Sequence, residues 1–151
     1  MAFIPKDAQW YLADIVEHIT VAGDKRSVVH TNMVLVRADS PEDAYEEAVK
    51  LGKEAELTYE NSAGKRVECR FRGLHDLNVI HDELVHGAEI GYSKEIGMKE
   101  SAIKAWVTPK RKLGIFRPIQ KPSGPDYADG EIVRKVADAM HAKKKQRQKN
   151  E

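Results

Sequence analysis

The chain has 151 residues, a length that fits one domain of ordinary size, with 41% apolar and 32% charged residues. Its single cysteine, Cys69, excludes an intrachain disulfide, and no apolar run approaches the roughly 18 residues of a membrane span. The opening residues, MAFIPKDAQW, lack the apolar run and cleavage pattern of a signal peptide. We therefore expect a cytoplasmic protein, in keeping with the reducing compartment that a lone cysteine suits.

The first predicted element is a β-hairpin. Residues 10–21 alternate between an apolar face and a more polar face, which is the period of a strand. A second stretch rich in β-branched residues covers residues 28–38, after the turn-forming pair Gly23 and Asp24. Two strands joined by a short polar loop are expected to pair in antiparallel fashion.

A helix is predicted over residues 40–52. Ser40 occupies the N-cap position, and Pro41 follows at the first helical position, where its missing N–H costs no hydrogen bond. Ala44, Ala48, Leu51 and Ala55 line one apolar stripe, whose small alanines would let the helix lie close on a sheet. Gly52 is the expected weak point or end of this helix.

Three further strands complete the predicted sheet. Residues 57–74 have the pattern of a strand, a turn and a second strand, and residues 88–96 alternate again. The order is therefore strand, strand, helix, strand, strand, strand. Hairpins on both sides of one helix predict an α+β fold, in which an antiparallel sheet of about five strands carries one helix on a face.

The composition changes near residue 97. Four of the six prolines lie beyond this point, and the last 26 residues have the pattern of a helix with a modest apolar stripe. We expect an α+β domain over residues 1–96. A basic, proline-containing arm with a C-terminal helix or tail is expected over residues 97–151.

The net charge of +1 hides a division between these two parts. Residues 1–93 hold 10 Lys/Arg and 17 Asp/Glu, a net of −7, whereas residues 94–151 hold 15 and 7, a net of +8. This division predicts that the arm either meets an acidic partner or folds back on its own domain. Docking on the domain is the favoured hypothesis, because Trp106, Ile115 and Phe116 are apolar anchors that a solvated tail would not need.

The order of features over roughly residues 10–95 resembles a known family. The likeness rests on Trp10-Tyr11, residues 38–48, residues 59–64, Phe71, Gly73-Leu74, Asp76-Leu77, residues 82–84, Gly87, Glu89 and Ile90. In their order and spacing these pieces resemble the uncharacterised bacterial domain-of-unknown-function family 4288. The resemblance implies a small bacterial domain, and it transfers no catalytic residue to this chain.

Residues 72–91 contain three of the six histidines, which are weak candidates for metal ligands: His75, His81 and His86. His81 and His86 would project about 140° apart on a helix, so they would not share a face. On a strand, His75 and His81 would lie about 20 Å apart. The histidines fall outside the family-like positions, whereas the acids among them fall on such positions: Asp76, Asp82, Glu83 and Glu89. We expect no tight metal site and a solvated polar segment.

Other catalytic arrangements have weak support. Cys69 alternates with Val67 and Phe71, which predicts a small buried apolar residue and not a nucleophile. A polar patch across the hairpin could include Asp14, Glu17, His18, His30 and Asn32. Cross-strand polar pairs of this kind are usually structural. Residues 73–87 contain no glycine-rich phosphate loop, and no cofactor is expected.

Two basic stretches are the better candidates for a partner site. The first comprises Lys110, Arg111, Lys112, Phe116 and Arg117, and the second comprises Lys143, Lys144, Lys145, Arg147 and Lys149. Basic residues beside an aromatic side chain could hold phosphates and stack a base. The alternatives are contact with an acidic protein surface and a solvated tail that keeps the protein soluble.

The sequence favours a small non-enzymatic binding or regulatory module with no catalytic residue. One alternative is an immunity or antitoxin-like protein, whose acidic domain would mask a basic partner. A second is a nucleic-acid-associated protein that acts through the basic tail, and a third is a hydrolase that uses the cluster of acids and histidines. A protein partner is favoured over nucleic acid, and no membrane partner is expected.

Overall fold

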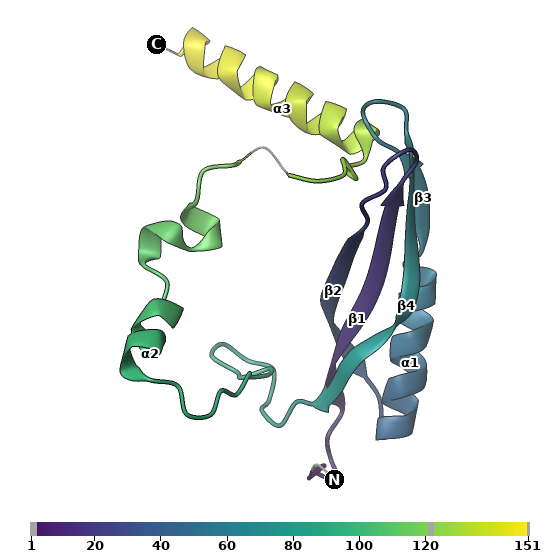
Figure 1. Ribbon diagram of the computed structural model, residues 1–151, viewed down its shortest axis with the longest axis vertical. Coiled ribbons are helices and arrows are strands. Elements are labelled where there is room, and N and C mark those ends of the chain that lie inside the picture. The colour runs from purple at the N-terminus through teal and green to yellow at the C-terminus, as the bar shows by residue number, and fades with distance from the viewer. Residues whose placement is uncertain (1–2, 121–122, 151) are drawn as a thin grey trace.

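The computed structural model describes residues 3–120 and 123–150. A four-stranded antiparallel sheet carries one helix on a face, and a long arm extends from the sheet and returns to one end of it (Figure 1). The strands are β1 (Trp10–Val21), β2 (Val28–Arg37), β3 (Leu57–Glu60) and β4 (Arg66–Val79). The helices are α1 (Pro41–Glu54), α2 (Glu100–Trp106), α3 (Gly130–Lys149) and the 3-10 turns η1 (Lys110–Lys112) and η2 (Gly114–Phe116). The predicted α+β class is confirmed.

The sheet order is β2-β1-β4-β3, so β1 has a neighbour on both sides. Its pairing with β2 is regular, whereas its pairing with β4 shifts register between Asp14 and Ile15 and again between Val16 and Glu17. Gly73 lies at this irregularity with a φ of 133°, which a residue with a side chain rarely adopts. The predicted bend at Gly73 is therefore present, and β4 continues past it to Val79.

The start of α1 agrees with the prediction. The Ser40 hydroxyl accepts the Asp43 N–H at 3.1 Å, and Ala48 is fully buried against the sheet. The predicted end is wrong, because α1 passes through Gly52 and ends at Glu54. Gly52 is buried against Phe71, whose ring would lie 2.4 Å from an added Cβ atom. Close packing on β4 thus outweighs the low helix propensity of glycine.

The predicted last strand, residues 88–96, is also wrong. This stretch has no regular structure, and its Glu89 N–H donates to the carboxylate of Asp82, in the preceding segment, at 3.0 Å. The physical reason lies in β4, which runs to Val79 and pairs there with Tyr11 of β1. Both sides of β1 are then occupied along its length, so residues 88–96 have no place beside the central strand.

Two clusters of buried side chains make up the core. The first lies under α1 and contains Tyr11, Ala13, Ile15, Val36, Ala44 and Ala48. The second lies at the other end of β1 and contains Ile19, Val21, Val67 and Cys69, with Val28, Tyr59 and Tyr127 packed against them. Tyr127 belongs to the arm, so the arm completes the part of the core that α1 does not cover.

The side chains that were expected to anchor the arm do not do so. Trp106, Ile115 and Phe116 are 69%, 87% and 52% exposed, and that prediction is wrong. The arm returns to the sheet through Tyr127 instead. The proposed boundary at residue 96 stays a prediction. None of the helices within residues 3–120 and 123–150 combines the length and the apolar character needed to cross a membrane.

Candidate functional site

The arm is held on the sheet by Tyr127. Its ring meets the ring of His30 on β2 edge to face, and the Tyr127 hydroxyl lies 3.2 Å from His30 Nε2, within hydrogen-bonding distance. The Tyr59 hydroxyl on β3 donates to the main-chain carbonyl of Tyr127. One residue of the arm therefore bridges the two outermost strands of the sheet across its face.

Asn61 holds the residue before this tyrosine. Its side-chain nitrogen donates to the carbonyl of Asp126 at 2.9 Å. Its side-chain oxygen accepts the N–H groups of Ala63 at 3.0 Å and Lys65 at 2.9 Å, which close the turn between β3 and β4. Asn61 is 6% exposed, and these hydrogen bonds satisfy both the donor and the acceptor of its buried side chain. The same amide thus shapes the turn and binds the arm.

The first turn of α3 packs on the backbone of this β3–β4 turn. An added Cβ atom on Gly130 would lie 2.9 Å from the carbonyl carbon and oxygen of Asn61. Asp129 caps the helix by accepting the N–H groups of Glu131 at 2.8 Å and Ile132 at 3.3 Å. We call the contact surface formed by Asn61, Tyr59, His30 and residues 126–130 the anchor.

A thiol lies beneath the anchor. Cys69 is 4% exposed, which confirms the predicted burial, and its sulfur lies 3.9 Å from the Tyr59 hydroxyl. Burial raises the pKa of the Cys69 thiol, with a further contribution from the negative charge of Glu17. Burial also raises the pKa of Tyr59, and its contact with Cys69 adds to the effect. Neutral thiol and phenol groups suit packing, not nucleophilic chemistry.

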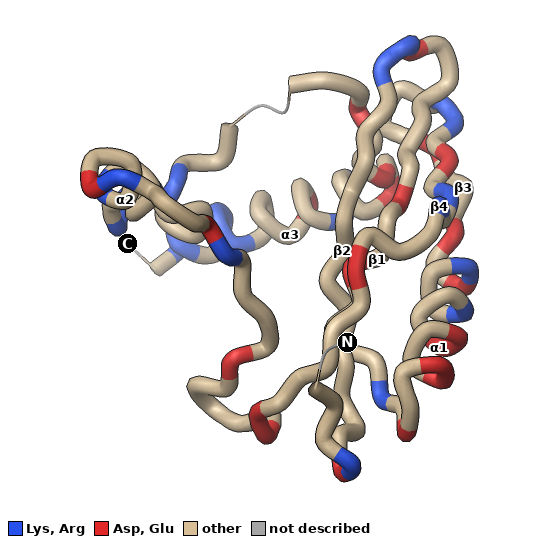
Figure 2. Tube along the Cα trace, turned by 60° about the horizontal axis from the view of Figure 1, so that its bottom comes forward, with Lys and Arg blue, Asp and Glu red and all other residues tan. Residues whose placement is uncertain are grey.

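Both predicted basic stretches are exposed along the arm. The first lies on η1, η2 and the residue that follows, where the Lys110 ammonium is 5.4 Å from the centre of the Phe116 ring. The second lies at the C-terminal end of α3, and every basic residue in both stretches is exposed. Figure 2 shows Lys and Arg on the arm and on α3, and several Asp and Glu on α1 among its lysines. The structure leaves both stretches accessible to a partner.

The three candidate metal ligands are spread over different segments. His75 lies on β4, and His81 and His86 lie in the irregular segment that follows, all with exposed side chains. Within the part of the chain that the structure describes, no group of three or more His, Cys, Asp or Glu side chains is placed to hold a metal ion. The nearby acid Asp76 instead accepts from the side-chain nitrogen of Asn78 at 2.8 Å, and this hydrogen bond lowers its pKa.

The structure divides the predicted polar patch of the hairpin. Glu17 pairs with His30, and Asn32 follows on the same face of β2. Asp14 and His18 occupy the alternate positions of β1 and so belong to the opposite face. Glu17 and Asn32 line a cavity of about 250 Å³ together with Ile15, Val16, Val34, Leu51, Gly52, Ala55 and Phe71. This cavity lies between the C-terminal end of α1 and the sheet.

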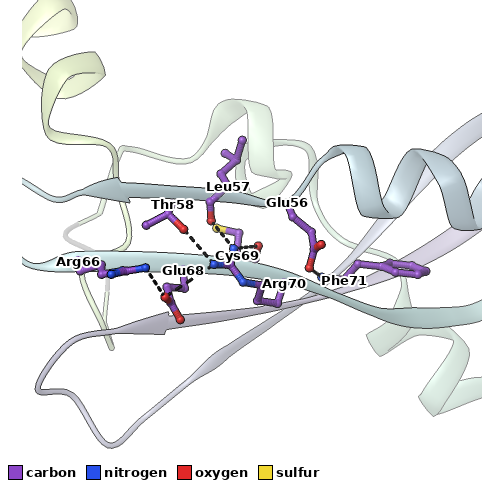
Figure 3. Close-up of polar contacts among 8 residues, drawn as sticks. All are labelled: Glu56, Leu57, Thr58, Arg66, Glu68, Cys69, Arg70 and Phe71. Atoms are coloured by element: carbon purple, nitrogen blue, oxygen red, sulfur yellow. Dashed lines mark hydrogen bonds and ion pairs between the residues drawn. The ribbon is translucent and has the colours of Figure 1, made fainter.

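A network of side chains joins β3 to β4 (Figure 3). The Arg70 guanidinium donates to the carbonyl of Leu57 and to the hydroxyl of Thr58, both at 3.0 Å. Glu68 pairs with Arg66 at 2.9 Å and lies 3.7 Å from Arg70. These contacts hold β3 and β4 together.

The family of the chain follows from comparison with known proteins. A family model described as Domain of unknown function (DUF4288) matches residues 10–93, more than half of the chain. The chain belongs to the DUF4288 family. No curated protein and no solved structure matches it. The DUF4288 match includes the whole sheet and α1, whereas the basic stretches and Tyr127 lie outside the matched residues.

Sequence reasoning missed the main residue of the site. Tyr127 is a single aromatic residue in a Gly- and Pro-containing stretch, so no periodicity marks it as buried. The available signal was local: Asp129 and Gly130 form a helix start directly after the tyrosine. A capped helix start beside a lone aromatic residue indicates a fixed point in the arm.

Proposed function

We propose that this chain is a non-enzymatic protein-binding module that presents α3 to an acidic partner protein. The observation that carries this proposal is an unpacked apolar stripe. Ile132, Val133, Val136 and Met140 follow one another at helical spacing and are 59%, 43%, 53% and 61% exposed. A stripe of this kind is what an amphipathic helix inserts into the groove of a partner.

The anchor supports this role because it fixes one end of α3 and leaves the other end accessible. Asp129 caps the start of the helix, and Gly130 packs on the backbone of Asn61. No residue of α3 between Gly130 and Lys149 is buried. Helix stability in proteins comes mostly from packing of an apolar face, so α3 gains stability when a partner covers its stripe.

The charge of α3 supports an acidic partner. Five basic residues follow Met140 on the helix: Lys143, Lys144, Lys145, Arg147 and Lys149. Opposite charge on a partner would speed the encounter and set the direction in which the helix lies. Helix α3 contains no Phe, Tyr or Trp, so it lacks the side chains on which nucleic-acid bases stack best. A protein groove therefore suits α3 better than a nucleic acid does.

The proposal is tested with a pair of variants of the full chain. The partner is isolated with the wild-type chain as bait, identified by mass spectrometry, purified and titrated against each variant. Val136→Asp places a charge in the stripe, and Ala142→Asp places the same charge on another side of α3. We expect Val136→Asp to weaken binding at least about tenfold, because an unpaired charge in an apolar groove is costly. Ala142→Asp should change the Kd less than about twofold.

The nucleic-acid alternative makes a different prediction in the same variants. Oligonucleotide binding would depend on salt and on Lys143, Lys144 and Lys145, and it would survive Val136→Asp. If the full chain shows that pattern, and both aspartate variants bind the purified protein partner equally well, the proposal of a protein-binding stripe is wrong.

A further inference from the structure

The two edge strands of the sheet differ in how well they are protected from pairing with another strand. At one edge, β3 has only 4 residues, and the Arg70 side chain ties it to β4 through the Leu57 carbonyl and the Thr58 hydroxyl (Figure 3). Just past its end, the Glu56 carboxylate accepts the free N–H of Phe71 at 3.1 Å. Short length and side chains that cover backbone groups are ways in which proteins protect a sheet edge.

The opposite edge, β2, has none of these features. It is 10 residues long, it contains no Pro and no Lys, and it pairs with β1 without a register shift. Within residues 3–120 and 123–150, no strand lies on its outer side, and β2 stands at the edge of the sheet in Figure 1. A long, regular and unprotected edge is a template for pairing with another strand.

One hydrogen bond identifies the backbone groups that are free. The Ala38 N–H donates to the Gln9 carbonyl at 3.0 Å, directly beyond the pair Trp10–Arg37. Hydrogen-bonded pairs alternate along an antiparallel ladder, so the even-numbered residues of β2 bond to β1. The N–H and C=O groups of the odd-numbered residues point away from the sheet: Val29, Thr31, Met33, Leu35 and Arg37.

Three of these five residues have apolar and accessible side chains. Val29, Met33 and Leu35 are 60%, 73% and 45% exposed, and they project from the face opposite α1. Arg37 is the single residue of β2 with a formal charge, and it stands at the end of the strand. A β2 strand therefore carries free backbone groups and apolar side chains together, with almost no charge to repel an identical strand.

We propose that β2 pairs in antiparallel fashion with β2 of a second copy of this chain, which joins two four-stranded sheets into one. An antiparallel pair of identical strands obeys a two-fold axis, so every contact is made twice. The register that uses all five outward residues places Met33 opposite Met33 of the second copy and Thr31 opposite Leu35. Val29 then lies opposite Arg37, and the free N–H and C=O groups of both edges are satisfied.

The first test measures mass and amide protection on the full chain. The dimer has twice the monomer mass of 17.0 kDa, and its fraction rises with concentration. In the dimer the amide protons of Thr31, Met33 and Leu35 become as protected from exchange as those of His30 and Asn32. A 17.0 kDa species at all concentrations with fast exchange at the odd positions overturns the proposal. Protection of the odd positions in such a monomer overturns it as well, because a segment of the same chain would then cover the edge.

The second test uses matched variants. Met33→Lys brings two like charges together at the two-fold axis and should weaken dimerisation at least about tenfold, because like charges directly opposite are destabilising. Val85→Lys changes a residue of similar exposure, 61%, outside the strands and should leave the dimer unchanged. Under oxidation, Met33→Cys should form a disulfide-linked dimer, since paired Cα atoms about 5.5 Å apart fit a disulfide. Equal dimerisation by Met33→Lys and the wild-type chain, with no cross-link through Met33→Cys, overturns the proposal.

Discussion

His30 and Tyr127 lie 97 residues apart in the sequence, yet their rings meet edge to face with their centres 5.3 Å apart. The contact joins an edge strand of the sheet to the arm, and its energetic value can be measured directly. Aromatic pairs in this geometry contribute about 0.5–1.5 kcal/mol beyond the area that they bury.

Removing the ring should loosen the arm. We expect Tyr127→Ala to lower the free energy of unfolding by about 2–4 kcal/mol, because a half-buried ring leaves the second core cluster. Tyr127→Phe removes only the hydroxyl next to His30 and should cost about 0.5–1.5 kcal/mol. Urea unfolding gives both values. Tyr92→Ala, at a tyrosine that is 81% exposed, serves as the control. Equal losses in Tyr127→Ala and Tyr92→Ala would show that the anchor does not hold the arm.

Gly130→Ala should destabilise the protein, although alanine normally favours a helix over glycine by about 1 kcal/mol. The added methyl group would lie 2.9 Å from the Asn61 backbone, which is fixed by its own turn. We expect a loss of about 1–3 kcal/mol, the usual cost of overpacking. Gly114→Ala is the control, because its nearest neighbour is the flexible end of Arg117 at 3.5 Å. A thermal midpoint for Gly130→Ala at or above that of the wild-type chain would contradict the predicted contact.

Stability should fall as the pH rises above about 9. The folded state raises the pKa of Cys69 above its ordinary value of 9.0 and the pKa of Tyr59 above 10.0. A raised pKa means that the fold favours the protonated group, so this contribution is complete at neutral pH and is lost as the groups ionise. Urea unfolding at several pH values between neutrality and about pH 10.5 measures the slope. Cys69→Ala should make the loss of stability that begins near pH 9 less steep. An unchanged slope would mean that other groups cause this loss.

The rate at which a thiol reagent modifies Cys69 should also show whether the anchor keeps the arm on the sheet. The thiol is buried beneath Tyr59, so in the wild-type chain a thiol reagent should modify it slowly at pH 8. Tyr127→Ala removes a neighbour of this cluster and should raise the rate several-fold without complete unfolding. The rate is followed by the absorbance of the released chromophore. Identical rates in the two proteins would mean that the arm does not shield the thiol.

The elements of the fold that local chemistry determines could be predicted from the sequence. Ser40 and Pro41 correctly placed the start of α1, and alternation correctly placed β1 and β2. The end of α1 could not be predicted, because Gly52 is retained in the helix by contact with Phe71 on a distant strand. Alternation alone did not make a strand of residues 88–96, since a strand also needs to pair with a neighbour, and β4 already occupies the second side of β1.

The site was harder to predict than the fold. The basic residues of the arm are identifiable from composition, but Tyr127 acts through partners that lie far away in the sequence. Asn61 was predicted to form a turn, which it does, and nothing in the sequence indicated that the same side chain also binds the Asp126 carbonyl. Contacts of this kind depend on the position at which the arm returns to the sheet. Composition and periodicity give no information about that position.

The anchor has a consequence for the residues between β4 and Asp126. Since the chain is fixed at Val79 and again at Asp126, the intervening residues form a tether closed at both ends. The entropy of closing a flexible tether grows only with the logarithm of its length, and each doubling costs about 0.6 kcal/mol. Insertions between α2 and η1 should therefore be tolerated, whereas one residue added between Tyr127 and Gly130 would misplace α3. Natural variation in length is expected to collect in the tether and to spare its attachment point.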